Sequence, residues 1–185
     1  MEAVSSEIIK QCQRGDKEAF RRLVQTYQRL VFSLSLKMLC DEEEAKDIVQ
    51  ETFLRVWQNI GSFDAEHPFV TWLYTIATRL CLDRLKSIRQ VVPYLGSEAV
   101  LRRFADSSDT NRVIENREWM AVVRMLTKEL SPKQRLVFTL CHLEELSSQE
   151  VEQITGMDAG QVKSNLYVAR QTIRKRLKAL GYGQD

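Results

Sequence analysis

The side chains with the clearest chemical potential lie near the end of the chain, where basic residues gather on one predicted helix. Residues 161–180 carry six Lys or Arg side chains and no acid, whereas residues 141–158 carry five acidic side chains and no Lys or Arg. Lys and Arg bind phosphate oxygens and release counterions from nucleic acid. The asymmetry therefore indicates nucleic-acid binding; the alternative is a solvated basic face on a plain helical hairpin.

Side chains suited to catalysis or metal binding are sparse. The chain has two histidines, His67 and His142, and it lacks the common phosphate-loop, dinucleotide and nucleophile-elbow motifs. Cys141 and His142 are adjacent, so on a helix they point about 100° apart and are poorly placed to share a metal. The acidic run 41–44 begins a predicted helix, whose positive end repels cations. We therefore expect no enzyme activity, no metal site and no cofactor.

The composition predicts the kind of fold that positions these side chains. Seven Gly and three Pro among 185 residues compare with roughly 22 expected from average usage. Because sheets need frequent turn residues, this deficit predicts an all-α protein of long helices and excludes a turn-rich β architecture. Hydrophobic residues make up 44% of the chain, which is ordinary for a protein that forms a core.

Cysteine use and hydropathy predict the compartment. The four cysteines, at positions 12, 40, 81 and 141, form no C-x-x-C pair and are widely spaced, which predicts buried free thiols in a reducing environment. The first residues lack a basic segment followed by an apolar core, so no secretory signal is expected. No stretch approaches the ~20 apolar residues of a membrane span. These observations predict a cytoplasmic protein without membrane insertion.

Helix-boundary signals divide the first half of the chain into four predicted helices. Gly15-Asp16 ends one helix and caps the next, and Asp41 with Glu44 reads as a capping box. Gly61 ends the third helix, and Pro68 suits the first turn of the fourth. Apolar residues recur at helical spacing behind each start. This half is predicted to be a small helical domain over residues 1–90.

Periodicity weakens over residues 91–112, which contain a polar run, and this segment is predicted to be a flexible linker. A second domain is predicted over residues 113–185. Three helix starts are expected there from three cap pairs: Ser131 with Gln134, Ser147 with Glu150, and Asp158 with Gln161.

The last two predicted helices have the arrangement of a helix-turn-helix motif. A short helix over 150–155 is followed by a turn containing Gly156 and by a long basic helix over 159–180. In such a motif the second helix enters the major groove, and its first turns reach base edges. The candidate DNA-contacting residues are Gln161, Lys163, Ser164, Asn165, Tyr167, Arg170 and Arg174. Lys175 and Lys178 lie further along and suit phosphate contact.

Three motifs resemble those of bacterial sigma factors. Residues 47–57 (DIVQETFLRVW) are similar to the family's polymerase-binding helix, and residues 71–77 (TWLYTIA) to a T-W-L-x-x-I-A helix of the same domain. Residues 160–170 (GQVKSNLYVAR) resemble the family's G-T-V-K-S-R-L-x-R-A-R recognition helix. Two domains without a full middle domain match the extracytoplasmic-function (ECF) subfamily.

The resemblance implies a function and a set of partners. It implies an alternative sigma factor, with a region 2 helical bundle and a region 4 helix-turn-helix, that binds core RNA polymerase, recognises −10 and −35 promoter elements and initiates transcription. The implied contacts on the polymerase are the beta-prime clamp helices and the beta flap, and an anti-sigma factor is the expected regulator. The implied polymerase-binding residues are Asp47, Gln50, Glu51, Leu54 and Arg55.

The resemblance also assigns −10 recognition and strand melting to the loop 63–67 and the helix that follows it. The implied residues there are Phe63, Asp64, His67, Trp72 and Arg79. Several positions depart from the family pattern. Many members have Asn where this chain has Arg79, and His67-Pro68 replaces a more flexible polar pair. Asn165 and Val168 stand where Arg is usual, so base preference is expected to differ at both elements.

Two other classes of protein fit part of the sequence. A dimeric helix-turn-helix regulator would bind DNA without polymerase, and it would have no need of the helix around Gln50 and Glu51. A purely protein-binding helical adaptor is disfavoured by the acid-free basic helix.

Overall fold

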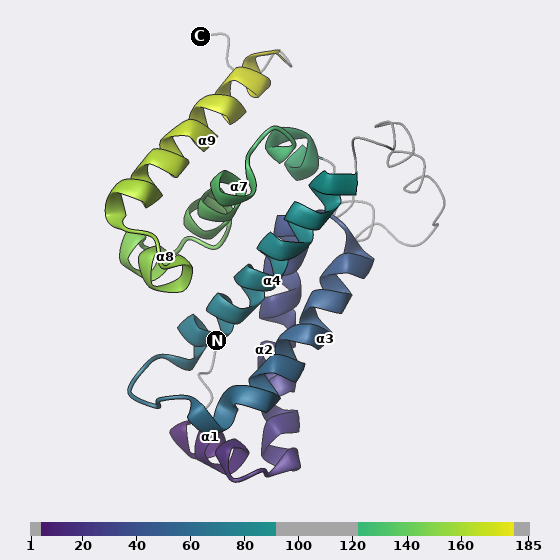
Figure 1. Ribbon diagram of the computed structural model, residues 1–185, viewed down its shortest axis with the longest axis vertical. Coiled ribbons are helices and arrows are strands. Elements are labelled where there is room, and N and C mark those ends of the chain that lie inside the picture. Colours follow the sequence, from purple (N-terminus) through teal and green to yellow (C-terminus); the bar gives the residue numbers. More distant parts are fainter. Residues whose placement is uncertain (1–4, 92–121, 180–185) are drawn as a thin grey trace.

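The computed structural model describes residues 5–91 and 122–179, with side chains placed for 5–87 and 122–179, and these residues are helical with no strand (Figure 1). The helices are α1 (Ser6–Gln13), α2 (Lys17–Leu39), α3 (Glu42–Asn59), α4 (Phe69–Val91), α7 (Pro132–Phe138), α8 (Ser148–Thr155) and α9 (Ala159–Ala179). A 3₁₀ turn, η1 (Ile60–Ser62), follows α3, and a π-helical turn, η3 (Thr139–Leu143), follows α7. Residues 122–127 are also helical. The predicted linker beyond residue 91 and the predicted domain start at 113 lie outside the described residues.

Local capping groups fix the helix starts of the first half, as the sequence predicts. Asp16 Oδ1 accepts hydrogen bonds from the backbone N–H groups of Glu18 (2.9 Å) and Ala19 (3.1 Å). Gly15 has a φ of +84°, a left-handed conformation that glycine adopts without steric cost. Asp41 caps α3 through the N–H of Glu44 at 3.1 Å. α4 begins at Phe69, so Pro68 lies at the cap position, one residue before the predicted first turn.

The second half begins its helices at the predicted cap residues, and both Ser131 and Ser147 form capping boxes. Ser131 and Gln134 exchange hydrogen bonds at the start of α7, and Ser147 and Glu150 do so at the start of α8. Gly156 ends α8 with a φ of +68°. These pairs satisfy backbone N–H groups that a helix start otherwise leaves without partners.

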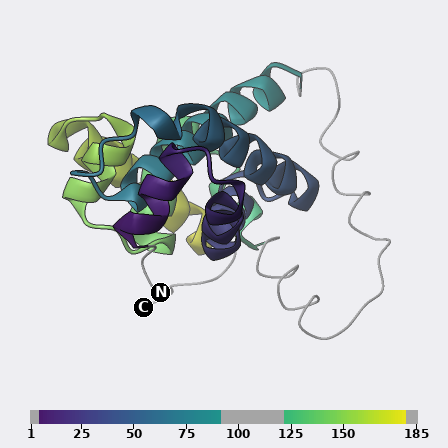
Figure 2. The same cartoon turned by 90° about the horizontal axis from the view of Figure 1, so that it is seen from below.

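The two halves of the molecule pack against each other. α1–α4 form a bundle, and α8 lies against α4 on the side away from α3 (Figures 1 and 2). Buried apolar side chains of α7, η3 and α8 join those of α1–α4 in one continuous cluster. A smaller cluster holds the far end of α9, through Leu130, Ala169 and Ile173. The predicted all-α fold of two helical domains is thus confirmed, with an interface between them that the sequence did not reveal. Within the described residues, none of the helices is both long and apolar enough to cross a bilayer.

Candidate functional site

The helix-turn-helix formed by α8 and α9 presents one face of α9 to solvent. Val162, Ala169 and Ile173 are buried and attach α9 to the rest of the domain. The first turn of α9 is held by a reciprocal pair: Asp158 Oδ1 accepts from the N–H of Gln161 at 2.8 Å, and Gln161 Oε1 accepts from the N–H of Asp158 at 3.3 Å. The buried stripe and the cap together fix which side chains face outward.

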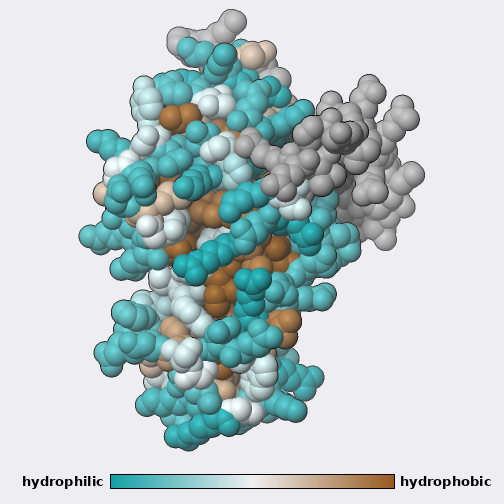
Figure 3. Space-filling view, in the orientation of Figure 1, coloured by the Kyte–Doolittle hydropathy of each residue, from teal (hydrophilic) through white to brown (hydrophobic). Residues whose placement is uncertain are grey.

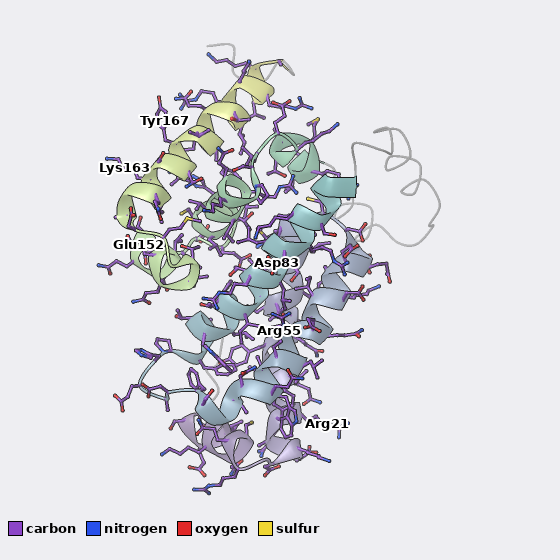
Figure 4. The ribbon with its side chains drawn as sticks, viewed as in Figure 1. Arg21, Arg55, Asp83, Glu152, Lys163 and Tyr167 are labelled. Carbon is purple, nitrogen blue, oxygen red and sulfur yellow. The ribbon has the colours of Figure 1, made fainter. Side chains whose placement is uncertain are left out.

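The structure brings the predicted −35 residues together on that outer face. Lys163 and Tyr167 project away from the molecule (Figure 4), and Tyr167 is 63% exposed. The exposed members of the set are Gln161, Lys163, Ser164, Tyr167, Arg170 and Arg174. Asn165 is partly buried, and its Nδ2 donates to the carbonyl of Gln161 at 2.8 Å. The face combines cations, amides and one aromatic ring, which are groups that contact phosphates and base edges.

Arg170 has a partner that sequence reasoning missed. Its Nε donates to His142 Nε2 at 2.9 Å, from α9 to η3. The His142 ring also packs on Phe138, with ring centroids 5.0 Å apart. Burial, followed by the nearby Arg170 cation, lowers the pKa of His142, which favours the neutral imidazole that this hydrogen bond requires. The two residues are 28 positions apart, so no local sequence signal could have paired them.

The predicted −10 loop has one side chain in the core. Phe63 is only 7% exposed, and its ring centroid lies 4.9 Å from that of Trp72 and 5.5 Å from that of Phe69. Gln13 Nε2 donates to the carbonyl of Phe63 at 2.8 Å. The structure therefore places this ring beneath the loop and not on its solvent face, where a base could stack on it.

The other predicted −10 residues lie at the surface. Asp64 and His67 are exposed, and Asp64 Oδ1 accepts from the N–H of Glu66 at 3.0 Å, which shapes the loop. Trp72 is half-buried and Arg79 is exposed. Trp72 and Arg79 are seven residues apart on α4 and so share one face, two turns from each other. The loop directly precedes α4, so these side chains together make up the candidate −10 surface.

The predicted polymerase-binding residues line the solvent side of α3. Phe53 and Val56 are buried on the opposite side, whereas Leu54 is 51% exposed although it is apolar. Figure 3 shows apolar surface among hydrophilic side chains where α3 and α4 run. A single exposed leucine is common on protein surfaces, so the case for docking here rests on the resemblance of the whole helix to the family's polymerase-binding helix.

Ion pairs engage several polar members of this α3 face. Glu51 accepts from Arg55 Nε at 2.8 Å, within the helix. Asp47 lies 3.8 Å from Arg84 Nη2 of α4, and the same guanidinium binds Glu44. Gln50 is exposed between these pairs. These ion pairs are solvent-exposed, so each contributes little to stability, and the carboxylates stay accessible to a partner.

The cysteines offer no reactive group to these surfaces. All four are free thiols, and three of them are buried. Burial raises the pKa of Cys81 to about 12, which keeps it protonated at neutral pH. Among the described residues, no group of three or more His, Cys, Asp or Glu side chains is placed to hold a metal ion.

The fold and these surfaces define a class: helical DNA-binding proteins that combine a helix-turn-helix with a second helical domain. Family comparison narrows the class. The family models for Sigma-70 region 2 and Sigma-70, region 4 match residues 23–90 and 120–173. The chain is 33% identical over 187 residues to the ECF RNA polymerase sigma factor SigW of Bacillus subtilis, covering 97% of this chain and 100% of that protein.

A second relative gives the same result. The chain is 30% identical to the ECF RNA polymerase sigma-E factor of Haemophilus influenzae, covering 94% of this chain and 95% of the relative. The chain therefore belongs to the ECF sigma factors, and it recognises promoters and initiates transcription with RNA polymerase.

Solved structures support the fold. CnrH in complex with the cytosolic domain of CnrY aligns with a TM-score of 0.68 at 23% identity, covering 93% of this chain and 96% of CnrH. RpoE in complex with the anti-sigma factor NepR from Bartonella quintana aligns with a TM-score of 0.62 at 21% identity, covering 86% of this chain and 96% of RpoE.

Proposed function

We propose that three surfaces of this chain divide the work of initiation. The outer face of α3 docks on core polymerase, the loop 63–67 with α4 opens the −10 element, and the outer face of α9 binds the −35 element. The observation that carries the proposal is the exposed basic face of α9, fixed in direction by its buried stripe. The chain contributes binding and strand capture, and bond formation belongs to the polymerase, so the chain itself is not an enzyme.

The proposal extends to domain limits, partner and compartment. Region 2 function is assigned to residues 1–90 and region 4 function to residues 113–185, on either side of a linker. The chain acts in the cytoplasm, where RNA polymerase acts. An anti-sigma factor is the proposed regulator, by analogy with RpoE, whose solved structure includes the anti-sigma factor NepR.

Reconstitution tests the proposed function directly. The full chain is mixed with core RNA polymerase and a genomic DNA library, and transcript 5′ ends are sequenced. We expect starts that share upstream elements near −10 and −35 and that vanish without this chain. Random starts, or starts independent of the chain, would reject the proposal.

The α3 face yields a prediction on polymerase affinity. The double substitution Gln50→Ala with Glu51→Lys is expected to weaken binding to core polymerase about tenfold, because it removes an amide contact and reverses a charge at a docking surface. The helical circular dichroism signal should be unchanged, since both residues lie on the solvent side. Glu18→Lys is the matched control: it also reverses an exposed acid beside an arginine, Arg21, but on α2. Equal affinity of the double variant and the control would remove α3 from the interface.

Two substitutions on the α9 face should distinguish a residue that reads bases from one that contacts phosphates. Lys163→Ala is expected to change the sequence preference of the full chain for −35 duplexes, because Lys163 lies in the first turns of α9, which reach base edges. Lys178→Ala should weaken all duplexes by a similar factor of about two to five and reduce the salt dependence. Titrations at several salt concentrations, with matched and scrambled duplexes, measure both effects. If the two variants behave alike, α9 does not lie in the groove as proposed.

The His142–Arg170 pair yields a prediction on pH. With its Nε held by His142, Arg170 keeps its two Nη groups free to contact DNA in a fixed direction. Protonation of His142 removes the acceptor and places a second cation beside Arg170. The ratio of specific to scrambled duplex affinity should therefore fall about fivefold as the pH drops from 8 toward 5.

Two variants separate this positioning role from a general loss of structure. His142→Gln keeps an acceptor oxygen and cannot titrate, so it should hold the specificity ratio nearly constant across the same pH range. His142→Leu removes the acceptor and should lower the ratio at every pH. A wild-type pH profile in the His142→Gln variant would show that another group titrates.

A further inference from the structure

The interface between the two domains is held at the C-terminal end of α2. The last carbonyls of a helix lack partners within it, and here two of them accept from arginines of the second domain. Arg135 Nη1 donates to the Met38 carbonyl at 3.1 Å, and Arg124 Nη2 donates to the Cys40 carbonyl at 2.6 Å. Both contacts also place a positive charge at the negative end of α2.

A second group of contacts converges on Glu144, just after η3. Its Oε1 accepts from Lys37 Nζ of α2 at 2.6 Å, and its Oε2 accepts from the Tyr74 hydroxyl of α4 at 2.7 Å. Lys37 also donates to the Leu143 carbonyl at 2.9 Å. The Lys37 and Glu144 side chains are only 20% and 10% exposed. One carboxylate of the second domain thus binds two helices of the first.

The protonation states suit this arrangement. Burial, and then the adjacent Glu144 carboxylate, raises the pKa of Tyr74. The phenol therefore stays protonated and remains a donor at any physiological pH. Glu144 and Lys37 bear opposite charges, so both bonds to the carboxylate are charge-assisted.

In the arrangement that the structure shows, with the two domains packed together, the chain cannot bind both promoter elements at once. The −10 and −35 elements lie 25 positions apart by their names, which is about 85 Å along straight duplex DNA. The loop 63–67 directly precedes α4, whose 23 residues span about 35 Å. α8 packs against α4, and α9 begins four residues after α8 ends. The start of α9 is therefore within about 60 Å of the loop, even with generous allowance for helix width and turn.

From these contacts we infer that Glu144 is the hub of an interdomain latch, formed with Lys37 and Tyr74, that holds the free chain closed and must release before both promoter elements are bound. This inference rests on the proposed division of −10 and −35 binding between the domains. Opening also exposes apolar side chains of the shared cluster, so the closed state persists until polymerase contacts offset that cost.

Chemical cross-linking tests the latch without any substitution. A carbodiimide joins a lysine amine to a carboxylate only where the two already touch. Treatment of the full free chain should yield a cross-linked Lys37–Glu144 peptide by mass spectrometry, and its yield should fall at least about fivefold in the promoter complex with core polymerase. The Lys86–Asp83 pair of α4, at 3.1 Å within one helix, is the matched control for cross-linking in the free chain, because its geometry does not depend on the domain interface.

Two outcomes would overturn the latch. The first is a free chain that yields the Lys86–Asp83 peptide but no Lys37–Glu144 peptide. The second is an unchanged Lys37–Glu144 yield in a complex that transcribes. Because the first readout needs no polymerase, it separates failure of the latch from failure of the proposed function.

Small-angle scattering of variants supplies an independent measurement. Glu144→Ala leaves Lys37 and Tyr74 without their shared acceptor, so it should increase the radius of gyration and raise the open fraction about tenfold or more. Glu145→Gln removes the neighbouring exposed carboxylate and should scatter like the wild type. Equal scattering by Glu144→Ala and the wild type, with both chains compact, would show that Glu144 does not hold the domains together.

Discussion

Phe63→Ala is expected to lower the free energy of unfolding by about 3–4 kcal/mol, one of the two largest effects predicted for this chain. The ring is 7% exposed and lies between Phe69 and Trp72. Phe69 in turn packs on Tyr27 of α2, with centroids 5.4 Å apart. The substitution therefore leaves a cavity where η1 and the start of α4 meet α2. Chemical denaturation followed by circular dichroism measures the loss.

Phe63→Leu distinguishes a core ring from a base-stacking ring. Leucine fills much of the same volume, so we expect a loss of only about 1–1.5 kcal/mol. Leucine has no π face, however, and stacking on an aromatic ring contributes roughly 1–3 kcal/mol per base. If Phe63 serves the core, Phe63→Leu should open promoters like the wild type. A stable Phe63→Leu variant that fails to melt DNA would assign the ring to the strand, and a fully stable Phe63→Ala variant would contradict its burial.

Helix boundaries could be predicted from the sequence because the groups that fix them are local. Asp16, Ser131 and Ser147 cap helices through N–H groups two or three residues away. Gly156 ends α8 with the left-handed backbone that glycine favours. In each of these contacts, donor and acceptor lie within one helical turn of each other in the sequence.

Two left-handed residues could not be predicted, because neither is glycine. Cys40 and Glu145 both have a φ of +55°, which costs roughly 1–2 kcal/mol for a residue with a Cβ. Cys40 is held by its burial and by the bond from Arg124 to its carbonyl. Glu145 follows Glu144 of the latch. At Cys40, a contact between distant segments thus holds a conformation that local preference opposes.

In the candidate surfaces, too, features set by neighbouring residues could be predicted, and features set by distant residues could not. Which residues of α9 face outward follows from the spacing of its buried stripe, and the structure has that stripe. The inward ring of Phe63 depends on Gln13 at the end of α1 and on Phe69 and Trp72 in the first turn of α4, which are two separate segments. The bond from Arg170 to His142 and the bonds to Glu144 join segments up to 107 positions apart. Sequence periodicity carries no information on such pairs.

With Phe63 in the core, we expect strand opening to depend on the exposed side chains of the loop and of α4. Arg79 is exposed, shares a face with Trp72, and offers a cationic fork to a phosphate or a base edge. A charge-assisted hydrogen bond contributes about 1.5–3 kcal/mol. Asp64 acts differently, since a carboxylate repels phosphates, and its Oδ1 accepts the N–H of Glu66 and shapes the loop.

The double variant Asp64→Ala with Arg79→Ala is therefore expected to reduce open-complex formation at least about tenfold. Polymerase affinity and −35 binding should be unchanged, because both side chains are exposed and neither belongs to the candidate surfaces of α3 and α9. Permanganate reactivity of thymines around −10 measures the opening. A template with a pre-melted bubble should restore most of the activity, since the cost of extruding bases is then already met.

Conservative variants assign the two roles separately. Asp64→Asn keeps the acceptor oxygen and should open promoters nearly as well as the wild type, whereas Asp64→Ala alone should be impaired. Arg79→Lys keeps the charge but loses the two-pronged donor, so it should lie between the wild type and Arg79→Ala. Normal permanganate reactivity of the double variant on duplex promoter would move the melting site elsewhere on the chain. An Asp64→Asn variant as defective as Asp64→Ala would instead mean that the carboxylate charge itself acts on the separated strand.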